Sequence, residues 1–244
     1  MSIRRATVTA TRAIGALAIA GSMLALTACV PFVTPGDRRT EDREIDDATE
    51  VVLRVGGDLT IRLGDEPALT VTGGENVLER LSTEVDDDRL VIGVNRGPLI
   101  VGERDLDIEV TVTSLESVII EGSGDVAAEF GSADDVSLDI RGSGEIETDA
   151  LDAQTVRTAI SGSGSIDVEG RADELEVNLS GSGDVDASGL ETATTRIVLS
   201  GSGNVSVDVR DSLDVTLSGS GTVRYSGRPE IRSSISGSGE IQPS

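Results

Sequence analysis

The sequence predicts an all-β protein, a parallel β-helix (β-solenoid) in which short coils of chain stack on one another. Three observations support the stacked coils: a turn motif at a nearly constant interval, alternating strands before each turn, and very few aromatic residues. The motif is Gly-Ser-Gly, which occurs seven times at intervals of 18 to 20 residues. Such a period is typical of a repeated unit stacked on itself. The turn glycines are Gly122, Gly124, Gly142, Gly144, Gly162, Gly164, Gly181, Gly183, Gly201, Gly203, Gly219, Gly221, Gly237 and Gly239.

The stretch before each turn alternates apolar and polar residues. Val136, Leu138 and Ile140, for example, alternate with polar neighbours. A period of two over six residues indicates a strand with one buried face. Each unit is therefore expected to be a strand, a Gly-Ser-Gly turn, a short strand and a second polar turn. A β-branched residue stands two positions after every motif: Val126, Ile146, Ile166, Val185, Val205, Val223 and Ile241.

Stacking explains how such short strands bury their apolar side. Two strands alone are marginal in water, whereas stacked coils pair every strand with its equivalents above and below. Glycines are needed where the backbone enters positive φ and where coils approach closely. The middle serines, Ser123 to Ser238, form a second column able to hydrogen-bond along the stack. The predicted core ladder is Ile140, Ile160, Leu179, Leu199, Leu217 and Ile235.

Composition agrees with a narrow interior. Aromatic residues are 1% of the chain and there is no Trp, so the core must be built from Val, Ile, Leu and Ala. Glycine is abundant, at 29 residues. Helical periodicity is confined to residues 75–81. These features favour a solenoid of about seven coils.

Residues 44–114 lack the motif but still have strand-like segments, at 51–55, 59–63, 69–71, 90–94 and 108–112. We expect them to form irregular first coils or a capping sheet, because a solenoid needs atypical ends to cover its core. The run at 86–88, three aspartates, indicates a turn. We expect a single β-helix domain over 44–244, irregular over 44–114 and regular over 115–244.

The N-terminus has the pattern of an export signal. Arg4, Arg5 and Arg12 precede an apolar stretch of small residues at 13–26, too short for a spanning helix. We expect residues 1–28 to be a signal peptide. Residues 29–43, with two prolines and a charged run, are expected to be a flexible tether.

The string Leu26-Thr27-Ala28-Cys29 resembles the lipobox of bacterial lipoproteins. The resemblance implies that Cys29 is acylated and becomes the mature N-terminus, so that the protein is exported and lipid-anchored on the extracytoplasmic face of the cell membrane. Cys29 is the only cysteine, so it cannot pair within the chain. The alternative is a plain secretory signal with an incidental cysteine.

The charge is strongly negative. After Cys29, 17 arginines face 44 acidic residues, a net charge of −27, and there is no Lys or His. Nucleic-acid binding is disfavoured because phosphate contacts need clustered positive charge, and so is electrostatic adhesion to anionic lipids. The acidity has several alternative explanations. It can serve solubility and the protection of open sheet edges, it can be an adaptation to high salt, or it can attract a basic or cationic partner.

Catalytic and metal-binding patterns are weak. Without His, and with Cys29 in the lipobox, Ser and Cys triads and His/Cys zinc sites are excluded. Paired-carboxylate glycosidase chemistry is permitted, but the three aromatic residues, Phe32, Phe130 and Tyr225, are few for a sugar cleft. We expect no catalytic residue, cofactor or metal ligand.

The position after each motif could still form a column of oxygens in which a Ca²⁺ bridges two neighbours. Calcium-roll repeats, however, recur every nine residues, and a solvated turn edge explains this column equally well. The column is Asp125, Glu145, Ser165, Asp184, Asn204, Thr222 and Glu240.

Several segments together resemble a known family. They are the stretch from Gly64 to Gly73, Asn76–Glu79, Asp88–Ile92, and Leu115–Val118 leading into Gly-Ser-Gly-Asp-Val. In arrangement they resemble DUF2807, also called the putative auto-transporter adhesin head GIN domain, over roughly residues 44–244. The resemblance implies a right-handed β-helix akin to pectin-lyase folds but without their catalytic residues, and an adhesion role.

The favoured function is a non-catalytic, lipid-anchored cell-envelope scaffold for adhesion or contact with a surface protein or glycan. The alternatives are an envelope-stress or signalling accessory that binds a membrane partner and, less favoured, a carbohydrate-active enzyme. One outward column is small and flat, which suits contact with another surface or dimerisation, although an ordinary sheet face explains it too. Its residues are Asp139, Ala159, Asn178, Val198, Thr216 and Ser234.

Overall fold

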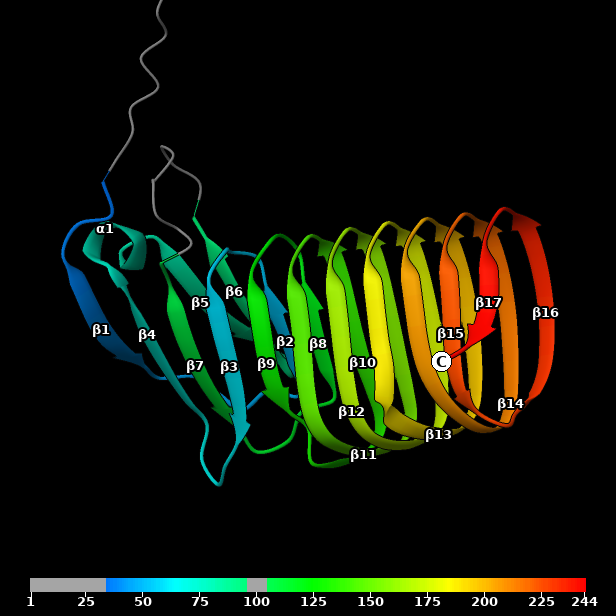
Figure 1. Ribbon diagram of the computed structural model, residues 1–244. Coiled ribbons are helices and arrows are strands. Elements are labelled where there is room, and N and C mark those ends of the chain that lie inside the picture. Colours follow the sequence, from blue (N-terminus) through cyan, green and yellow to red (C-terminus); the bar gives the residue numbers. More distant parts are fainter. Residues whose placement is uncertain (1–33, 96–104) are drawn as a thin grey trace, which may run out of the picture. The chain divides into compact units, whose positions relative to one another are not determined.

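The computed structural model describes residues 34–95 and 105–244. These residues form seventeen strands and one short helix, α1 (Glu75–Leu78), at the position where the sequence shows local helical periodicity. The strands wind into a β-solenoid of about six turns, so the predicted fold class is confirmed and the expected seven coils are close. Figure 1 shows the coils stacked side by side, from the green to the red strands.

The regular part is a stack of long parallel strands. It contains β10 (Ser132–Gly142), β11 (Glu145–Gly162), β12 (Ser165–Gly181), β13 (Asp184–Gly201) and β14 (Asn204–Gly219). Each strand pairs in parallel with the next, and the Gly-Ser-Gly motifs fall in register, as in Gly142 with Gly162 and Gly162 with Gly181. The regular spacing of the motif is therefore the register of the stack.

The second turn of each unit differs from the expectation of two short strands separated by a polar turn. β11 to β14 run without a break from one Gly-Ser-Gly to the next, over 16 to 18 residues each. The second corner is only a shift of register, for example between Thr148 and Leu151. A bend inside a strand keeps most ladder hydrogen bonds, which explains why this corner needs no fixed turn motif.

The predicted core ladder is confirmed for its first five residues and wrong for the burial of Ile235. Ile140, Ile160, Leu179, Leu199, Leu217 and Ile235 are consecutive partners in the parallel register. The first five are at most 2% exposed, whereas Ile235 is 47% exposed. Ile235 differs because its strand, β16 (Glu230–Gly237), is the last in the stack and pairs on one side with β14.

The N-terminal coils do not stack in chain order. β2 (Glu50–Leu53) and β3 (Asp58–Leu63) form the first coil along the chain. This coil lies between β6 (Arg89–Val94) with β7 (Asp107–Val112) on one side and β8 (Ser117–Ile120) with β9 (Asp125–Glu129) on the other. The chain therefore lays down its second coil outside the first before the stack continues toward the C-terminus.

Antiparallel strands cover this end, as the sequence predicts. β4 (Ala68–Gly74) pairs with β7, and β5 (Leu81–Asp86) pairs with β6. The expected turn at 86–88 joins β5 to β6, with Asp87 at a φ of +54°. Capping strands shield the apolar end of a solenoid from water.

The expected tether is wrong for its last six residues. Residues 38–43 form β1 (Arg38–Arg43), which pairs antiparallel with β4. The Arg43 guanidinium donates hydrogen bonds of 2.8 Å to the carbonyl oxygens of Leu78 and Leu81. Charged residues usually indicate a solvated segment, but here the backbone ladder and this arginine hold the segment in the cap.

β15 (Thr222–Gly227) and β16 form the last complete coil, and β17 (Glu240–Pro243) begins a further one. β15 and β17 pair in parallel, and β15 also pairs with β14. Across all described coils the interior is aliphatic, as the composition predicts, with Phe130 (2% exposed) as the one fully buried aromatic side chain there.

Candidate functional site

The Gly-Ser-Gly motifs form a sharp corner where each coil closely approaches the previous one. The first glycines have φ between +125° and +156°. A Cβ on Gly162 would lie 2.2 Å from the Gly142 carbonyl oxygen, and one on Gly164 would lie 2.5 Å from that of Gly144. These distances leave no room for a side chain. The glycines therefore serve the stacking, and their small size gives the corner no chemistry of its own.

The corner column extends into the N-terminal coils, which was not expected from the sequence. The Asp125 amide donates to the Gly57 carbonyl oxygen at 3.0 Å, and the Asp58 amide donates to that of Leu106 at 2.8 Å. Gly57 has a φ of +123°, like the corner glycines. The sequence feature that could have indicated this extension is the pair Gly56-Gly57 before an aspartate. The pair lacks the serine of the later motifs.

The serines of the motif act through their backbone. The Ser163 amide donates to the Gly142 carbonyl oxygen at 2.9 Å, and the same bond recurs along the stack at 2.8 to 2.9 Å. The predicted column of serines therefore exists, but its hydrogen bonds come from main-chain amides.

The predicted outward column forms one continuous row across the coils. Asp139, Ala159, Asn178, Val198, Thr216 and Ser234 are successive partners in the parallel register. We call this row and its flanks the small-residue face. Between Asp139 and Val198 it is hollowed to about 530 Å³. Val198 is 38% exposed on this surface.

The row beside the small residues carries alternating charges. Arg157, Glu176, Arg196 and Asp214 follow one another in register. Arg157 pairs with Asp135 at 2.8 Å and with Glu176 at 3.4 Å. The hydrogen bond to Asp135 raises the pKa of Arg157, and the negative charges of Asp135 and Glu176 add to this effect. In the lining of the hollow itself, Arg141 pairs with Asp139 at 2.6 Å. Because these charges compensate one another, the hollow is close to neutral on a strongly acidic chain.

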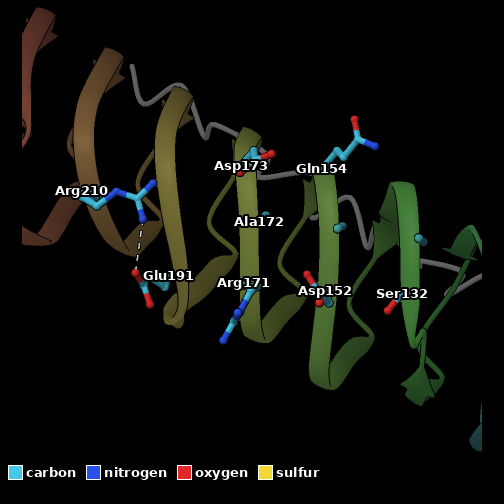
Figure 2. Close-up of a pocket in the computed structure, with 10 residues that line it drawn as sticks. Ser132, Asp152, Gln154, Arg171, Ala172, Asp173, Glu191 and Arg210 are labelled. Carbon is cyan, nitrogen blue, oxygen red and sulfur yellow. Dashed lines mark hydrogen bonds and ion pairs between the residues drawn. The ribbon is translucent and has the colours of Figure 1, made fainter.

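A second hollow, the polar groove, follows the second corner of the coils (Figure 2). It has a volume of about 400 Å³ and is lined from Ser132 to Arg210. Asp152, Arg171 and Glu191 lie in register across three coils. Figure 2 shows Arg210 reaching Glu191, with 3.4 Å between the guanidinium and the carboxylate. This groove was not expected from the sequence because its residues lay in a predicted surface turn.

The strands that follow the Gly-Ser-Gly motifs carry acidic side chains on their outer side, which we call the acidic face. Carboxylates of this face accept hydrogen bonds within the stack. Asp125 Oδ1 accepts a hydrogen bond from the Glu145 amide at 3.2 Å, and Asp184 Oδ1 accepts one from the Asn204 amide at 3.1 Å. Among residues 34–95 and 105–244, no three acidic, His or Cys residues are grouped to hold a metal ion. The expected column of oxygens is present, but two of its members, Asp125 and Asp184, bond the backbone of the next coil.

One carboxylate of this face titrates unusually. Partial burial raises the pKa of Asp167, and the like charges of Asp186 and Glu169 raise it further. Desolvation and like charges both disfavour the ionised form. The shift therefore comes first from burial of Asp167 in the stack and then from its acidic neighbours, which by themselves indicate no chemistry.

The remaining sequence predictions fall outside these surfaces. Cys29 and Phe32 lie outside the described residues. Phe130 is buried and Tyr225 packs against the core, so neither offers an open ring for stacking on a sugar. In the described part of the chain, no helix is long and apolar enough to cross a membrane.

The fold and its surfaces define a class: a β-solenoid whose hollows lie on the outer faces of its coils. The chain belongs to the DUF2807 family, described as "Putative auto-transporter adhesin, head GIN domain", whose model matches residues 48–229. A search of curated proteins gave no match.

Solved structures share the fold. A putative adhesin from Bacteroides fragilis is 20% identical with a TM-score of 0.80, covering 87% of this chain and 100% of its own. A putative lipid binding protein from Parabacteroides distasonis is 25% identical with a TM-score of 0.72, covering 88% and 100%. A putative adhesin from Parabacteroides merdae is 20% identical with a TM-score of 0.67, covering 87% and 99%. The family description favours an adhesion-like role, and the solved structures show the shared fold.

Proposed function

We propose that the protein is a non-catalytic, lipid-anchored scaffold on the extracytoplasmic face of the cell membrane, and that it binds a protein partner through the small-residue face. The observation that carries this is the hollow of about 530 Å³ on a neutral sheet face of an acidic chain. Small side chains let a partner approach the sheet closely. The family description as an adhesin head supports the class of function.

The chemistry of the hollow favours a protein over a glycan. Ala159 and Val198 provide apolar contact and Asn178 provides an amide, whereas sugar sites usually offer an aromatic ring. The −27 charge after Cys29 favours a partner surface with net positive charge, because complementary fields speed association. We therefore propose a basic protein surface as the occupant.

The lipid anchor rests on the lipobox resemblance around Cys29. Two acyl signals are enough for stable membrane attachment without a spanning helix. Replacing Cys29→Ser should move the protein from the membrane fraction to the soluble exported fraction. Retention of the variant in the membrane fraction would contradict acylation, and mass spectrometry of the mature N-terminus gives an independent answer.

The contact surface is tested by a charge substitution with a matched control. Val198→Arg places a long side chain over the hollow, whereas Ser206→Arg makes the same change of charge on the acidic face of the neighbouring coil. Cross-linked envelope complexes are compared for wild type and both variants. The complex should be lost only with Val198→Arg. Equal loss with both variants, or no loss, would refute the assignment.

A glycan array tests whether the partner is a glycan instead of a protein. If the protein binds glycans and Arg171→Ala removes that binding, the polar groove is the binding site and the small-residue face is not. If nothing binds in the array while the envelope complex persists, the protein partner is supported.

A further inference from the structure

Arg196 extends the small-residue face beyond its predicted column. It lies two residues before Val198 on β13, and both side chains are exposed. Alternate residues of a strand point to the same side, so Arg196 and Val198 share this surface. Two residues of a strand span about 7 Å, and the long arginine side chain therefore lies beside the hollow that Val198 lines.

The guanidinium group of Arg196 has no partner. It makes no hydrogen bond or ion pair within the part of the chain that the structure describes. Other arginines of its row differ, since Arg157 pairs with Asp135 at 2.8 Å and Arg232 pairs with Glu230 at 2.9 Å. A guanidinium has five N–H donors in a planar fork. The donors of Arg196 are therefore available to a bound molecule.

A carboxylate without a partner lies next to Arg196. Asp214 of β14 is its register partner, and among the described residues this carboxylate forms no ion pair or side-chain hydrogen bond either. Arg196 and Asp214 line a small polar hollow of about 130 Å³, together with Thr194 and Ser212. Paired strands lie about 4.8 Å apart. A group of donors and an acceptor thus lie side by side in one hollow.

The charges of this polar hollow select the group that it can hold. Its lining has three carboxylates and two arginines, a net charge of −1. This balance repels the carboxylate or phosphate of a partner, while a lone ammonium group would face the guanidinium of Arg196. A neutral carboxamide fits, because its oxygen accepts a hydrogen bond from a guanidinium while its NH₂ donates one to a carboxylate. Asn and Gln side chains carry this group.

We propose that Arg196 and Asp214 form the polar contact of the small-residue face and bind the side-chain carboxamide of an Asn or Gln of the protein partner. Arg196 donates to the carboxamide oxygen, and Asp214 accepts from the NH₂ group. A neighbouring side chain of the partner fills the larger hollow that Val198 lines. This contact rests on the proposed function, because it assigns the residues that orient a partner on the face proposed to bind it.

Labelling of free guanidinium groups with phenylglyoxal tests the contact on the unsubstituted full chain. Arg171 in the polar groove is the matched control, because it is also exposed and without a partner among the described residues. In the purified protein both arginines should be labelled, whereas in intact cell envelopes the label should be lost at Arg196 and kept at Arg171. Equal labelling of the two arginines in envelopes would overturn the proposal.

Substitution separates this contact from the proposed function. Arg196→Gln should abolish the cross-linked envelope complex, and Arg171→Gln, which changes the charge equally, should keep it. The thermal midpoint of each variant verifies folding. A complex that survives Arg196→Gln but is lost with Val198→Arg would refute the polar contact and leave the proposed function standing. Absence of the complex in the wild type would refute both.

A photoreactive residue at position 194 tests the carboxamide itself. Thr194 lines the polar hollow, so a cross-link from this position reports the partner residues that enter it. Mass spectrometry of the cross-linked peptide should find an Asn or Gln at or next to the linked residue. A linked peptide of the partner that contains neither would refute recognition of a carboxamide.

Discussion

Replacing one corner glycine by alanine tests the stacking most sharply. Gly162 has a φ of +141°, and a Cβ there would lie 2.2 Å from the Gly142 carbonyl oxygen. Backbone strain at such a φ costs about 1–3 kcal/mol. Relieving the overlap by moving a coil costs about 1–3 kcal/mol more. Gly162→Ala should therefore lower the free energy of unfolding by about 2–6 kcal/mol, a large share of a typical domain stability.

The chain contains its own control at the start of the regular repeats. A Cβ on Gly122 would meet no atom within 4 Å, although its φ of +156° is still a backbone conformation that L residues rarely adopt. Gly122→Ala should therefore cost only the backbone strain, about 1–3 kcal/mol, without the added cost of moving a coil. Both variants are compared by urea unfolding followed by circular dichroism. Equal destabilisation by the two substitutions, or a silent Gly162→Ala, would refute the close approach of the coils.

Three further predictions concern buried and charged groups. Thr148 is 2% exposed and its hydroxyl has no partner, so Thr148→Val should stabilise the protein by about 1 kcal/mol. Thr192→Val should destabilise the protein, because the Thr192 hydroxyl donates a hydrogen bond to the Asp208 carbonyl oxygen at 2.8 Å. Chemical denaturation that gives the opposite order of stability would contradict both assignments. Folding raises the pKa of Asp167, so ionisation of this carboxyl group opposes folding. Asp167→Asn should therefore stabilise the protein at pH 7, and this gain should shrink as the pH falls through the raised pKa. A difference in unfolding free energy that does not change with pH would refute this. The thermal midpoint should be the same with Ca²⁺ and with a chelator, because the acidic face has no metal-ligand grouping in the described ranges; a rise with Ca²⁺ would show a site.

The regular coils could be predicted because stacking turns register into sequence spacing. Equivalent residues such as Ile140 and Ile160 must recur once per coil, so the motif interval shows the fold directly. The glycine corners followed from the same spacing and from their lack of a side chain.

The N-terminal order could not be predicted because neighbouring coils there are not consecutive in the chain. Nothing local in β2 and β3 indicates that β6 and β7 will be laid on their outer side. The strand β1 was missed for a related reason: its charged residues suit solvent, and its pairing with β4 is a long-range contact.

Of the two candidate surfaces, one could be predicted from the sequence and the other could not. The small-residue face was visible in the sequence because its residues recur at the period of the stack. The polar groove was not, because the second corner has variable length and Arg171 and Glu191 become neighbours only after the register shifts.

Site-specific photo-cross-linking in intact cell envelopes tests the central claim most directly. A photoreactive residue replaces Asn178 in the hollow of the small-residue face or, as the control, Ser206 on the acidic face. The proposed function predicts one discrete cross-linked protein from position 178 and none from position 206. The same product from both positions, or product from position 206 alone, would contradict the claim that the small-residue face is the contact surface.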